Sequence, residues 1–519
     1  MSGPVTWLQQ FARMTPTAPC LGTPDGWVTY DQLLARVEKV RALLFHAGVR
    51  EGARVVLALP NVIGTVVGWL AVQSLGATSV ELDRESSELA LAEAVRQVKP
   101  VLALISGRDG KKWSSIPVER FVLVHPGQPP ESLKSLLGGR SAGWISEEGL
   151  TDFVGMEQPP VLEPEIAQVV FTSGSTSTPR GVLQTTKNLE ASTAGIVEFL
   201  ELTRADRAML VLPLFYVYGK SVLLSHLKVG GSVFLDHRFM YPRLVMSAIG
   251  HERCTNFAGV PVTFESLRRR VVDLSSIDHW SLRFVTQAGG AMNAETIEWT
   301  RQAFAPAELY VMYGQTEATS RLSYLPPELA ETKAGSVGRG MPGVELKVVD
   351  DQGHDVAPGV EGQLVARGEV VMRGYLEAPE ETEKALREGW LWTGDLATCD
   401  EDGFVFITGR AKHVLKLGGH RVSPAELERA LTSRPGVREA VVVGAPDGLE
   451  GEVAIAFVIS DDQRLDQGAL LKHCRSLLPA PRVPKRVVLV PDFPRSTSGK
   501  VLVGELQRRA AELVTPERA

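Results

Sequence analysis

The sequence predicts an α/β protein with a large N-terminal domain, a small β subdomain and a small α+β C-terminal domain. Short β-branched runs alternate with helical stretches over most of the chain, as in PVLALIS, FVLVHP and AQVVFTS, and this alternation favours parallel sheets with helices on both faces. Past residue 335, Asp-Gln-Gly and Pro-Gly turns separate alternating strands, which is typical of antiparallel structure. Beyond Gly409, a run of helix, strand, strand, helix and strand indicates a separate compact domain.

The individual elements follow in order along the chain. Apolar residues at helical spacing predict a helix from Leu33 to Leu44, and the strand RVVLALP comes next. Residues 55–80 carry no charge, but they include prolyl, amide and glycyl breaks, so a buried strand followed by a buried helix explains them better than a membrane span. Later strands are AMLVLPL, GSVFLD, EAVVVGAP, VAIAFVI and RVVLV, and later helices are PRLVMSAIGHER, VTFESLRRRVVDL, SPAELERALTSR and GALLKHCRSLL.

Composition excludes several classes of protein. The 519 residues are 44% apolar and 22% charged, which argues against a disordered chain. A net charge of −6, from 55 basic and 61 acidic residues, matches neither nucleic acid nor an anionic membrane surface. Four scattered cysteines form no zinc or redox spacing, and the N-terminus does not look like a signal peptide, so we expect a cytoplasmic protein with reduced thiols.

The clearest local signal is QVVFTSGSTSTPRGV, where a β-branched strand runs into small and hydroxyl residues and then Arg180. Small residues let backbone N–H groups approach a polyanion, hydroxyls add donors, and the arginine adds positive charge. The loop contains neither a Walker A motif nor the G-x-S-x-G of a hydrolase nucleophile. A flexible serine- and threonine-rich linker is the alternative interpretation.

Three further motifs follow this loop. Tyr313-Gly314-Gln315-Thr316-Glu317 offers a carboxylate for Mg²⁺ and a ring for a base, although a lone glutamate at a strand end is usually only solvated. Trp392-Thr393-Gly394-Asp395 offers an aspartate that could cap a turn or accept two ribose hydroxyls. Near the end, Pro494-Arg495-Ser496-Thr497-Ser498-Gly499-Lys500 presents a lysine that is either solvent-facing or carried into a site.

Together and in this order, these motifs resemble the AMP-forming adenylate ligase superfamily of acyl- and aryl-CoA ligases, adenylation domains and luciferases. GRAKHVLKLGGHRVSP is similar to the hinge motif of that superfamily, and the resemblance covers essentially the whole chain. It implies two parallel-rich α/β sheets and a small β subdomain in the N-terminal domain, and a mobile C-terminal domain. Within the superfamily, the chain looks closest to aryl-CoA ligases of the benzoate and anthranilate type.

The resemblance implies a role for each matching position. Lys500, Thr316 and Glu317 would be catalytic, with Glu317 holding Mg²⁺ and Lys500 bridging the attacking carboxylate and the α-phosphate. Lys412 would be the hinge, and Gly418 and Gly419 the thiol channel. The implied ATP site consists of Thr172, Ser173, Gly174, Ser175, Thr176, Arg180, Gly289, Gly290, Ala291, Tyr313, Gly314, Thr316, Asp395 and Arg410.

The same resemblance divides the chain into an N-terminal core (residues 1–409), a hinge (410–413) and a mobile C-terminal domain (414–519). Ser177 and Arg180 depart from the commonest pattern but keep small size and charge. His413 replaces an acid that is common beside the hinge.

The substrate is less sharply indicated. The implied acid pocket comprises Phe215, Tyr216, Tyr218, Gly219, Ala258, Gly259, Gly289 and Gly314. Three clustered aromatic rings suit a flat aryl acid such as a benzoate or aminobenzoate, and a medium-chain fatty acid is the alternative.

Coenzyme A is the expected thiol, with an acyl carrier protein as the alternative partner, and the implied cofactors are ATP and Mg²⁺. A nucleotide-binding protein without turnover is a further alternative. The intact Glu317, Asp395 and Lys500 argue against it.

Overall fold

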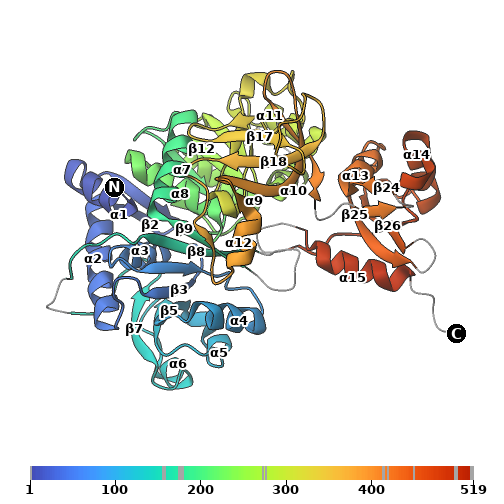
Figure 1. Cartoon of the computed structure of the whole chain (residues 1–519). Helices are drawn as coiled ribbons and strands as arrows, with labels where there is room; N and C mark the ends of the chain where they lie inside the picture. Colours follow the sequence, from blue (N-terminus) through green and yellow to red (C-terminus); the bar gives the residue numbers. More distant parts are fainter. Residues whose placement is uncertain are drawn as a thin grey trace. The chain divides into compact units, whose positions relative to one another are not determined.

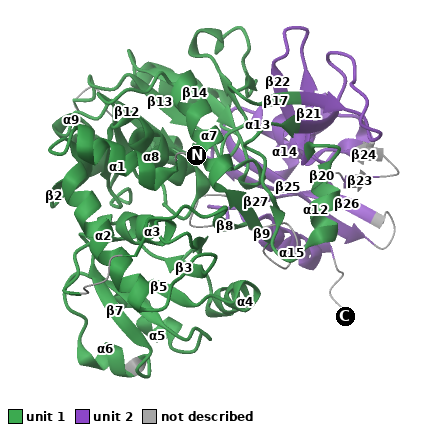
Figure 2. Ribbon diagram, turned by 60° about the vertical axis from the view of Figure 1, so that its left-hand side comes forward, with its two compact units in different colours: residues 1–346, 366–391 green, residues 347–365, 392–519 purple. Residues whose placement is uncertain are grey.

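The computed structural model describes residues 3–154, 159–172, 180–271, 274, 278–411, 415–417, 420–447, 451–495 and 501–514. The chain forms two compact units (Figure 2). Unit 1 comprises Met1–Leu346 and Ala366–Leu391, and unit 2 comprises Lys347–Val365 and Trp392–Ala519.

Unit 1 contains an eight-stranded sheet with the order β19-β9-β8-β4-β3-β5-β6-β7. Strands β3, β5, β7, β8 and β9 of this sheet are labelled in Figure 1. Strands β3 to β8 run parallel, and β9 and β19 add antiparallel strands at one edge. Strands β3, β5, β6 and β8 of this sheet overlap the predicted strand runs 54–60, 100–106, 121–126 and 167–173. Its strands are β3 (Arg54–Ala58), β4 (Thr78–Glu81), β5 (Leu102–Ser106), β6 (Phe121–His125), β7 (Ser141–Ser146), β8 (Ile166–Thr172), β9 (Arg180–Thr185) and β19 (Gly374–Tyr375).

A nine-stranded sheet in unit 1 has the order β16-β15-β14-β13-β12-β10-β11-β1-β2. Its central strands β14, β13, β12, β10, β11 and β1 are parallel, so the segments that follow their carboxyl ends emerge at one edge, where α/β proteins bind ligands. Its strands are β1 (Pro19–Thr23), β2 (Gly26–Thr29), β10 (Arg207–Leu210), β11 (Ser232–Leu235), β12 (Asn256–Gly259), β13 (Phe284–Gln287), β14 (Glu308–Tyr313), β15 (Ser323–Leu325) and β16 (Arg339–Gly340).

Helices cover both faces of the eight-stranded sheet, as predicted. Val55 and Leu57 of β3 face a core shared with the nine-stranded sheet, whereas Val56 and Ala58 face a second core beneath α4, as expected from the two-residue period of a strand. The helices of unit 1 are α1 (Pro4–Met14), α2 (Tyr30–His46), α3 (Ile63–Gln73), α4 (Glu88–Val98), α5 (Gly110–Trp113), α6 (Glu131–Leu136), α7 (Thr186–Phe199), α8 (Val217–Val229), α9 (Pro242–His251), α10 (Pro261–Arg270), α11 (Ala294–Ala303) and α12 (Pro379–Ala385).

The uncharged segment 55–80 forms β3, α3 and β4. Every residue of α3 is buried, which accounts for its apolar composition without a membrane. Among the described residues, no helix has the length and hydropathy that crossing a bilayer requires. The prediction of a buried strand followed by a buried helix is confirmed.

The predicted antiparallel region forms a five-stranded sheet, in which β21 pairs antiparallel with β20 and with β22. The order is β17-β18-β21-β20, with β22 also on β21. The strands are β17 (Glu345–Val349), β18 (Gly362–Arg367), β20 (Leu386–Arg387), β21 (Trp390–Cys399) and β22 (Val405–Arg410).

The C-terminal part of unit 2 is an α+β structure, as predicted. In β25, Ala440 and Val442 face a core with α13 and α14, and Val441 and Val443 face a core with α15. The elements are β23 (Leu415–Leu417), β24 (His420–Val422), α13 (Pro424–Thr432), β25 (Val437–Asp447), β26 (Gly451–Ser460), α14 (Gln467–Leu477), β27 (Arg486–Leu489) and α15 (Val503–Val514).

Candidate active site

The hydroxyl-rich loop connects the two strands of a hairpin. Thr172 ends β8, Arg180 begins β9, and the two residues are paired in the antiparallel register. The loop residues between them, including Ser173, Gly174, Ser175 and Thr176, lie outside the described residues. The hairpin therefore fixes where the loop begins and ends, and it places Arg180 at the base of the loop.

Arg180 lies beside Tyr375 of β19, the strand next to β9. Its guanidinium carbon is 5.6 Å from the centre of the Tyr375 ring, and its Nη2 is 2.7 Å from Glu381 Oε2. The Tyr375 hydroxyl donates a hydrogen bond to Glu317 Oε1 at 3.0 Å. Burial, together with Glu317, raises the pKa of Tyr375 above its usual range. The hydroxyl therefore stays protonated and can donate this hydrogen bond. One tyrosine thus links the predicted phosphate-binding cation to the predicted Mg²⁺ ligand.

The Thr316–Glu317 turn is anchored to β9 through its backbone. Gln184 Nε2 donates a hydrogen bond to the Thr316 carbonyl at 2.8 Å, and the Met372 N–H donates one to the Glu317 carbonyl at 2.8 Å. Gly314 must be glycine, because a Cβ atom there would lie 2.0 Å from the carbonyl oxygen of Ser320. The motif therefore presents its polar side chains from a backbone that is held at several points.

The predicted adenine segment follows β13. Gly289 has a φ of +87°, and both Gly290 and Ala291 are exposed. Gln287 Nε2 donates a hydrogen bond to the Gly290 carbonyl at 2.7 Å. Tyr313, half-buried, ends the neighbouring strand β14, so the structure brings this ring to the same edge of the sheet.

The predicted acid-binding residues gather at this edge of the nine-stranded sheet. Tyr216 directly precedes α8, and its hydroxyl would lie 2.9 Å from a Cβ atom at Gly289. Tyr218 is buried, and its hydroxyl lies 2.9 Å from the Thr286 carbonyl and 2.8 Å from Thr286 Oγ1. Burial raises the pKa of Tyr218 to about 12. The other predicted members are half-buried Phe215, buried Gly219 in α8, Ala258 and Gly259 in β12, and Gly314.

The predicted ribose-binding residues face each other in unit 2. Asp395 and Arg410 are register partners of β21 and β22, and Arg410 Nε is 2.8 Å from Asp395 Oδ1. Asp395 is 3% exposed, whereas 58% of the Arg410 side chain is exposed. The buried carboxylate is therefore held in place by a cation that solvent and ligands can reach.

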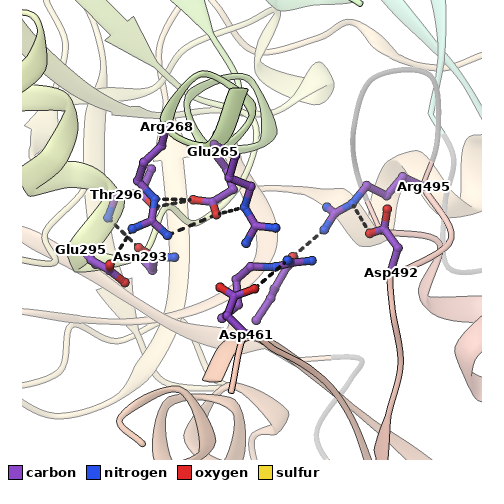
Figure 3. Close-up of polar contacts among 11 residues, drawn as sticks. Glu265, Arg268, Asn293, Glu295, Thr296, Asp461, Asp492 and Arg495 are labelled. Carbon is purple, nitrogen blue, oxygen red and sulfur yellow. Dashed lines mark hydrogen bonds and ion pairs between the residues drawn. The ribbon is translucent and has the colours of Figure 1, made fainter. Parts of the chain in front are cut away.

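The other predicted residues of unit 2, Lys412, Gly418, Gly419 and Lys500, lie outside the described residues. The segment 496–500 is nevertheless framed by described residues, because Arg495 and Val501 form an antiparallel bridge. Arg495 Nη2 is 2.5 Å from Glu439 Oε2, and Figure 3 shows Arg495 beside Asp492. The described residues on either side of the predicted lysine motif are therefore paired with each other, and Arg495 is tied to β25.

Figure 3 also draws a cluster within unit 1, around Glu265 of α10. This carboxylate accepts hydrogen bonds from Arg268, Arg269 and Thr296 and so ties α10 to α11. Burial opposes its ionisation, but these bonds outweigh the effect and lower the pKa of Glu265. The cluster supports the helix that follows Ala258 and Gly259.

Two family models match the chain. The model of the AMP-binding enzymes matches residues 8–376, and that of their C-terminal domain matches residues 426–500. The chain belongs to the AMP-binding enzymes. The resemblance seen in the motifs is thereby confirmed.

This AMP-binding enzyme has relatives along its full length. It is 32% identical over 512 residues to a feruloyl-CoA synthase of an Amycolatopsis species, and the match covers 97% of this chain and 98% of that one. The o-succinylbenzoate CoA synthetase of Bacillus subtilis, solved with its acyl-adenylate intermediate, has a TM-score of 0.82 and 26% identity, over 96% of this chain and 97% of that one. An anthranilate CoA ligase solved with anthranoyl-AMP shares the fold, with a TM-score of 0.82 and 24% identity, over 98% and 97% of the two chains.

Family and relatives establish the class of reaction. The AMP-binding enzyme is an AMP-forming acid–thiol ligase that uses ATP, Mg²⁺ and coenzyme A. It activates a carboxylic acid to an acyl-adenylate with release of diphosphate, and then transfers the acyl group to coenzyme A with release of AMP.

Two residues of this site, Tyr375 and Glu381, were not predicted from the sequence. They follow Gly374, which has a φ of +149° and places its backbone against Thr382 of α12. A glycine and a tyrosine next to the acidic run PEETEK were the only local signal. Their link to Arg180 arises from strand pairing across the chain.

Proposed function

We propose that the acid substrate of this ligase is a benzoate-like aryl acid, a class that includes aminobenzoates such as anthranilate. The observation that carries the proposal is the contact between the Tyr216 hydroxyl and Gly289, which sets an aromatic ring against the segment assigned to adenine. A flat acid on that ring would have its carboxylate near the nucleotide. Relatives named feruloyl-CoA synthase, indoleacetate–CoA ligase and 2-succinylbenzoate–CoA ligase support an aryl acid.

The first half-reaction joins two anions, the substrate carboxylate and the α-phosphate of ATP. Arg180 would bind the β- and γ-phosphates together with the loop 172–176, and Thr316 would donate a hydrogen bond to the α-phosphate. Lys500 would bridge the carboxylate and the α-phosphate. Positive charge and donors that are already in position lower the barrier, because little reorganisation is then needed as charge moves to the leaving diphosphate.

Glu317 fits a Mg²⁺ site. Its carboxylate is half-buried, and Tyr375 holds one of its oxygens. The described residues contain no cluster of three or more His, Cys, Asp or Glu that could bind a metal, which suits an ion that shares its coordination with phosphate oxygens and water. Bound there, Mg²⁺ would neutralise phosphate charge.

Asp395 and Arg410 would hold the ribose. The aspartate can accept hydrogen bonds from both ribose hydroxyls, and Arg410 already fixes the position of its carboxylate. Tyr313, Gly289, Gly290 and Ala291 would enclose the adenine.

The second half-reaction has no need of Lys500. We infer that residues 414–519 rotate about the hinge 410–413 relative to residues 1–409, with Lys412 as the pivot. This movement would withdraw Lys500 and bring Gly418 and Gly419 to the site as a channel for the thiol. The hinge, the glycines and the lysine all lie beyond Gly409, and this supports the inference.

A medium-chain fatty acid is the alternative substrate, and an acyl carrier protein is the alternative thiol partner. We place the enzyme in the cytoplasm, where ATP and coenzyme A are available and thiols stay reduced. The four cysteines, Cys20, Cys254, Cys399 and Cys474, are all free, which fits that compartment.

Exchange of labelled diphosphate into ATP, measured over benzoates, hydroxybenzoates, aminobenzoates and C4–C12 fatty acids, tests the acid. We expect the highest rate with an aryl acid, and a higher rate with fatty acids would overturn the proposal. Release of AMP in the presence of ATP, the acid and coenzyme A, without any carrier protein, would show that a carrier protein is not needed.

A further inference from the structure

Arg321 is a buried cation without a counter-ion among the residues that the structure describes. It is 2% exposed, and its Nε and Nη1 atoms are buried without a hydrogen-bond partner. Burial lowers the pKa of Arg321, yet a guanidinium titrates so far above neutrality that it stays charged. The folded protein therefore holds a positive charge with unused donors inside unit 1.

A second buried cation in unit 1 shows how the fold can compensate such a charge. Lys220 of α8 lies 3.2 Å from Glu81 Oε1, and its amine is 4.3 Å from the centre of the Trp69 ring. Both side chains of this ion pair are almost fully buried. Arg321 has the aromatic contact without the carboxylate, because its guanidinium carbon lies 5.0 Å from the centre of the Tyr218 ring.

The contact with Tyr218 does not compensate the charge. The attraction between a cation and an aromatic ring is weaker than the cost of burying an unpaired charge. The Tyr218 hydroxyl lies within hydrogen-bonding distance of Thr286 and also interacts with the guanidinium, but the Nε and Nη1 atoms of Arg321 still have no partner. A buried donor without a partner is rare enough in proteins to require an explanation, and a ligand acceptor is one.

The position of Arg321 points to the acid substrate. Its Cα atom would lie 2.7 Å from a Cβ atom at Gly314, so the two backbones are in direct contact. Its side chain lies against Tyr218. Gly314 and Tyr218 are both residues assigned to the acid pocket, and they come from different elements, the end of β14 and α8. Arg321 therefore lies where these two walls meet.

We propose that Arg321 binds an anionic substituent of the substrate acid, at the end opposite the carboxylate that is activated. This proposal rests on the proposed function and narrows it: the substrate class becomes acids that carry a second carboxylate, with one carboxylate adenylated and the other paired with Arg321. An amino substituent would not satisfy Arg321 in this way, because its N–H groups, like those of the guanidinium, are hydrogen-bond donors. Charge-assisted bonds to a carboxylate would satisfy the buried Nε and Nη1 atoms.

Diphosphate exchange with matched acids tests this proposal. The acids are terephthalate and isophthalate, their monomethyl esters, benzoate and 4-aminobenzoate, with adipate and hexanoate as an aliphatic pair. Wild-type enzyme should use the best dicarboxylate at least about 10-fold more efficiently, as kcat/KM, than the corresponding ester or unsubstituted acid. Arg321→Met should abolish or reverse this preference.

Arg41 offers a matched control, because it is also a buried arginine of unit 1. It lies in α2 and is 6% exposed, and no residue assigned to the acid pocket belongs to that helix. Arg41→Met should leave the ratio of dicarboxylate to monoacid unchanged. If Arg321→Met does not fold, the same ratio is measured with Arg321→Gln. The preference of the wild-type enzyme for dicarboxylates over monoacids then tests the proposal together with that variant.

Thermal unfolding gives a readout that does not depend on turnover. A saturating dicarboxylate should raise the Tm of the wild-type protein and not that of Arg321→Met. Without ligand, the variant should be no less stable, because an unpaired buried charge has been removed. If wild type and variant used dicarboxylates and monoacids equally well, the assignment of Arg321 would be overturned, but the proposed ligase function would stand. If no acid supported diphosphate exchange, the proposed function itself would be contradicted.

Discussion

The hydroxyl of Tyr375 donates a hydrogen bond to Glu317 Oε1 at 3.0 Å, although the two residues lie 58 positions apart in the chain. Because Arg180 lies beside the same ring, a single tyrosine positions the cation and the carboxylate on which MgATP binding is expected to depend. Removal of the tyrosine hydroxyl should therefore weaken the use of Mg²⁺.

Tyr375→Phe should raise the Mg²⁺ concentration needed for half-maximal diphosphate exchange several-fold and reduce the maximal rate by about 10-fold, because Glu317 loses the bond that orients it. The measurement is a Mg²⁺ titration at saturating ATP and acid. Tyr310→Phe is the control, since the Tyr310 hydroxyl also donates a hydrogen bond to a glutamate, Glu308, in unit 1. An unchanged Mg²⁺ requirement in Tyr375→Phe would refute a positioning role.

Lys500→Ala should lose at least ~100-fold in acyl-adenylate formation but keep thioester formation from supplied acyl-adenylate, because only the first step needs the charge. The two half-reactions are measured separately by diphosphate exchange and by release of AMP. The control is Lys472→Ala, an exposed lysine of α14. If both half-reactions fell equally, the rotation about Lys412 would be untenable.

Gly419→Leu should block thioester formation while diphosphate exchange continues, because a branched side chain would fill the proposed thiol channel. Gly504→Leu is the matched control, since a Cβ atom at Gly504 has open space around it. Thioester yield is measured with coenzyme A and the preferred acid. A normal yield from Gly419→Leu would remove this glycine from the channel.

Buried His226 predicts a loss of stability in mild acid. Asn256 Nδ2 lies 2.9 Å from its Nε2, and its Nδ1 lies 2.8 Å from the Val222 carbonyl, which suits a neutral ring. Burial lowers the pKa of His226 to about 4, from 6.5. Between these values the unfolded chain binds a proton that the folded protein does not, so stability falls as pH falls from 6.5 to 4.

The contribution of this single group is at most about 1.4 kcal/mol per pH unit. Urea unfolding of the full chain at about pH 7, 6 and 5 measures it. His226→Gln should be less stable at neutral pH but should show a shallower decline toward mild acid. His251→Gln, at an exposed histidine, should follow the wild type. The same decline in His226→Gln as in the wild type would assign it to other groups.

The fold could be predicted well from the sequence where the signal is local. Strands such as β3, β5 and β6 are uninterrupted apolar runs because they are buried on both faces, and the two-residue period of β25 separates its two cores. The sequence also singles out Glu317, Asp395 and Arg180 as candidate site residues, because the chemistry expected of them requires small residues and charges at fixed spacing, and their roles stay predictions.

Two other features depend on interactions across the chain and could not be found in this way. The pairing of β19 with β9 brings Tyr375 to Arg180, and no local pattern indicates which distant strands will pair. Arg321 follows a stretch of small polar residues and would ordinarily be expected on the surface. Only its burial and its unbonded donors distinguish it from a solvated arginine.

The most direct test of the central claim is to incubate the enzyme with ATP, Mg²⁺ and an aryl acid in the absence of coenzyme A, and to identify the nucleotide product by mass spectrometry. We predict that an acyl-adenylate forms in an amount close to that of the enzyme and that diphosphate is released. When coenzyme A is then added, the acyl-adenylate should be consumed, and AMP and the acyl thioester should form. Formation of ADP and an acyl phosphate, or of no acyl nucleotide with any acid, would contradict the account.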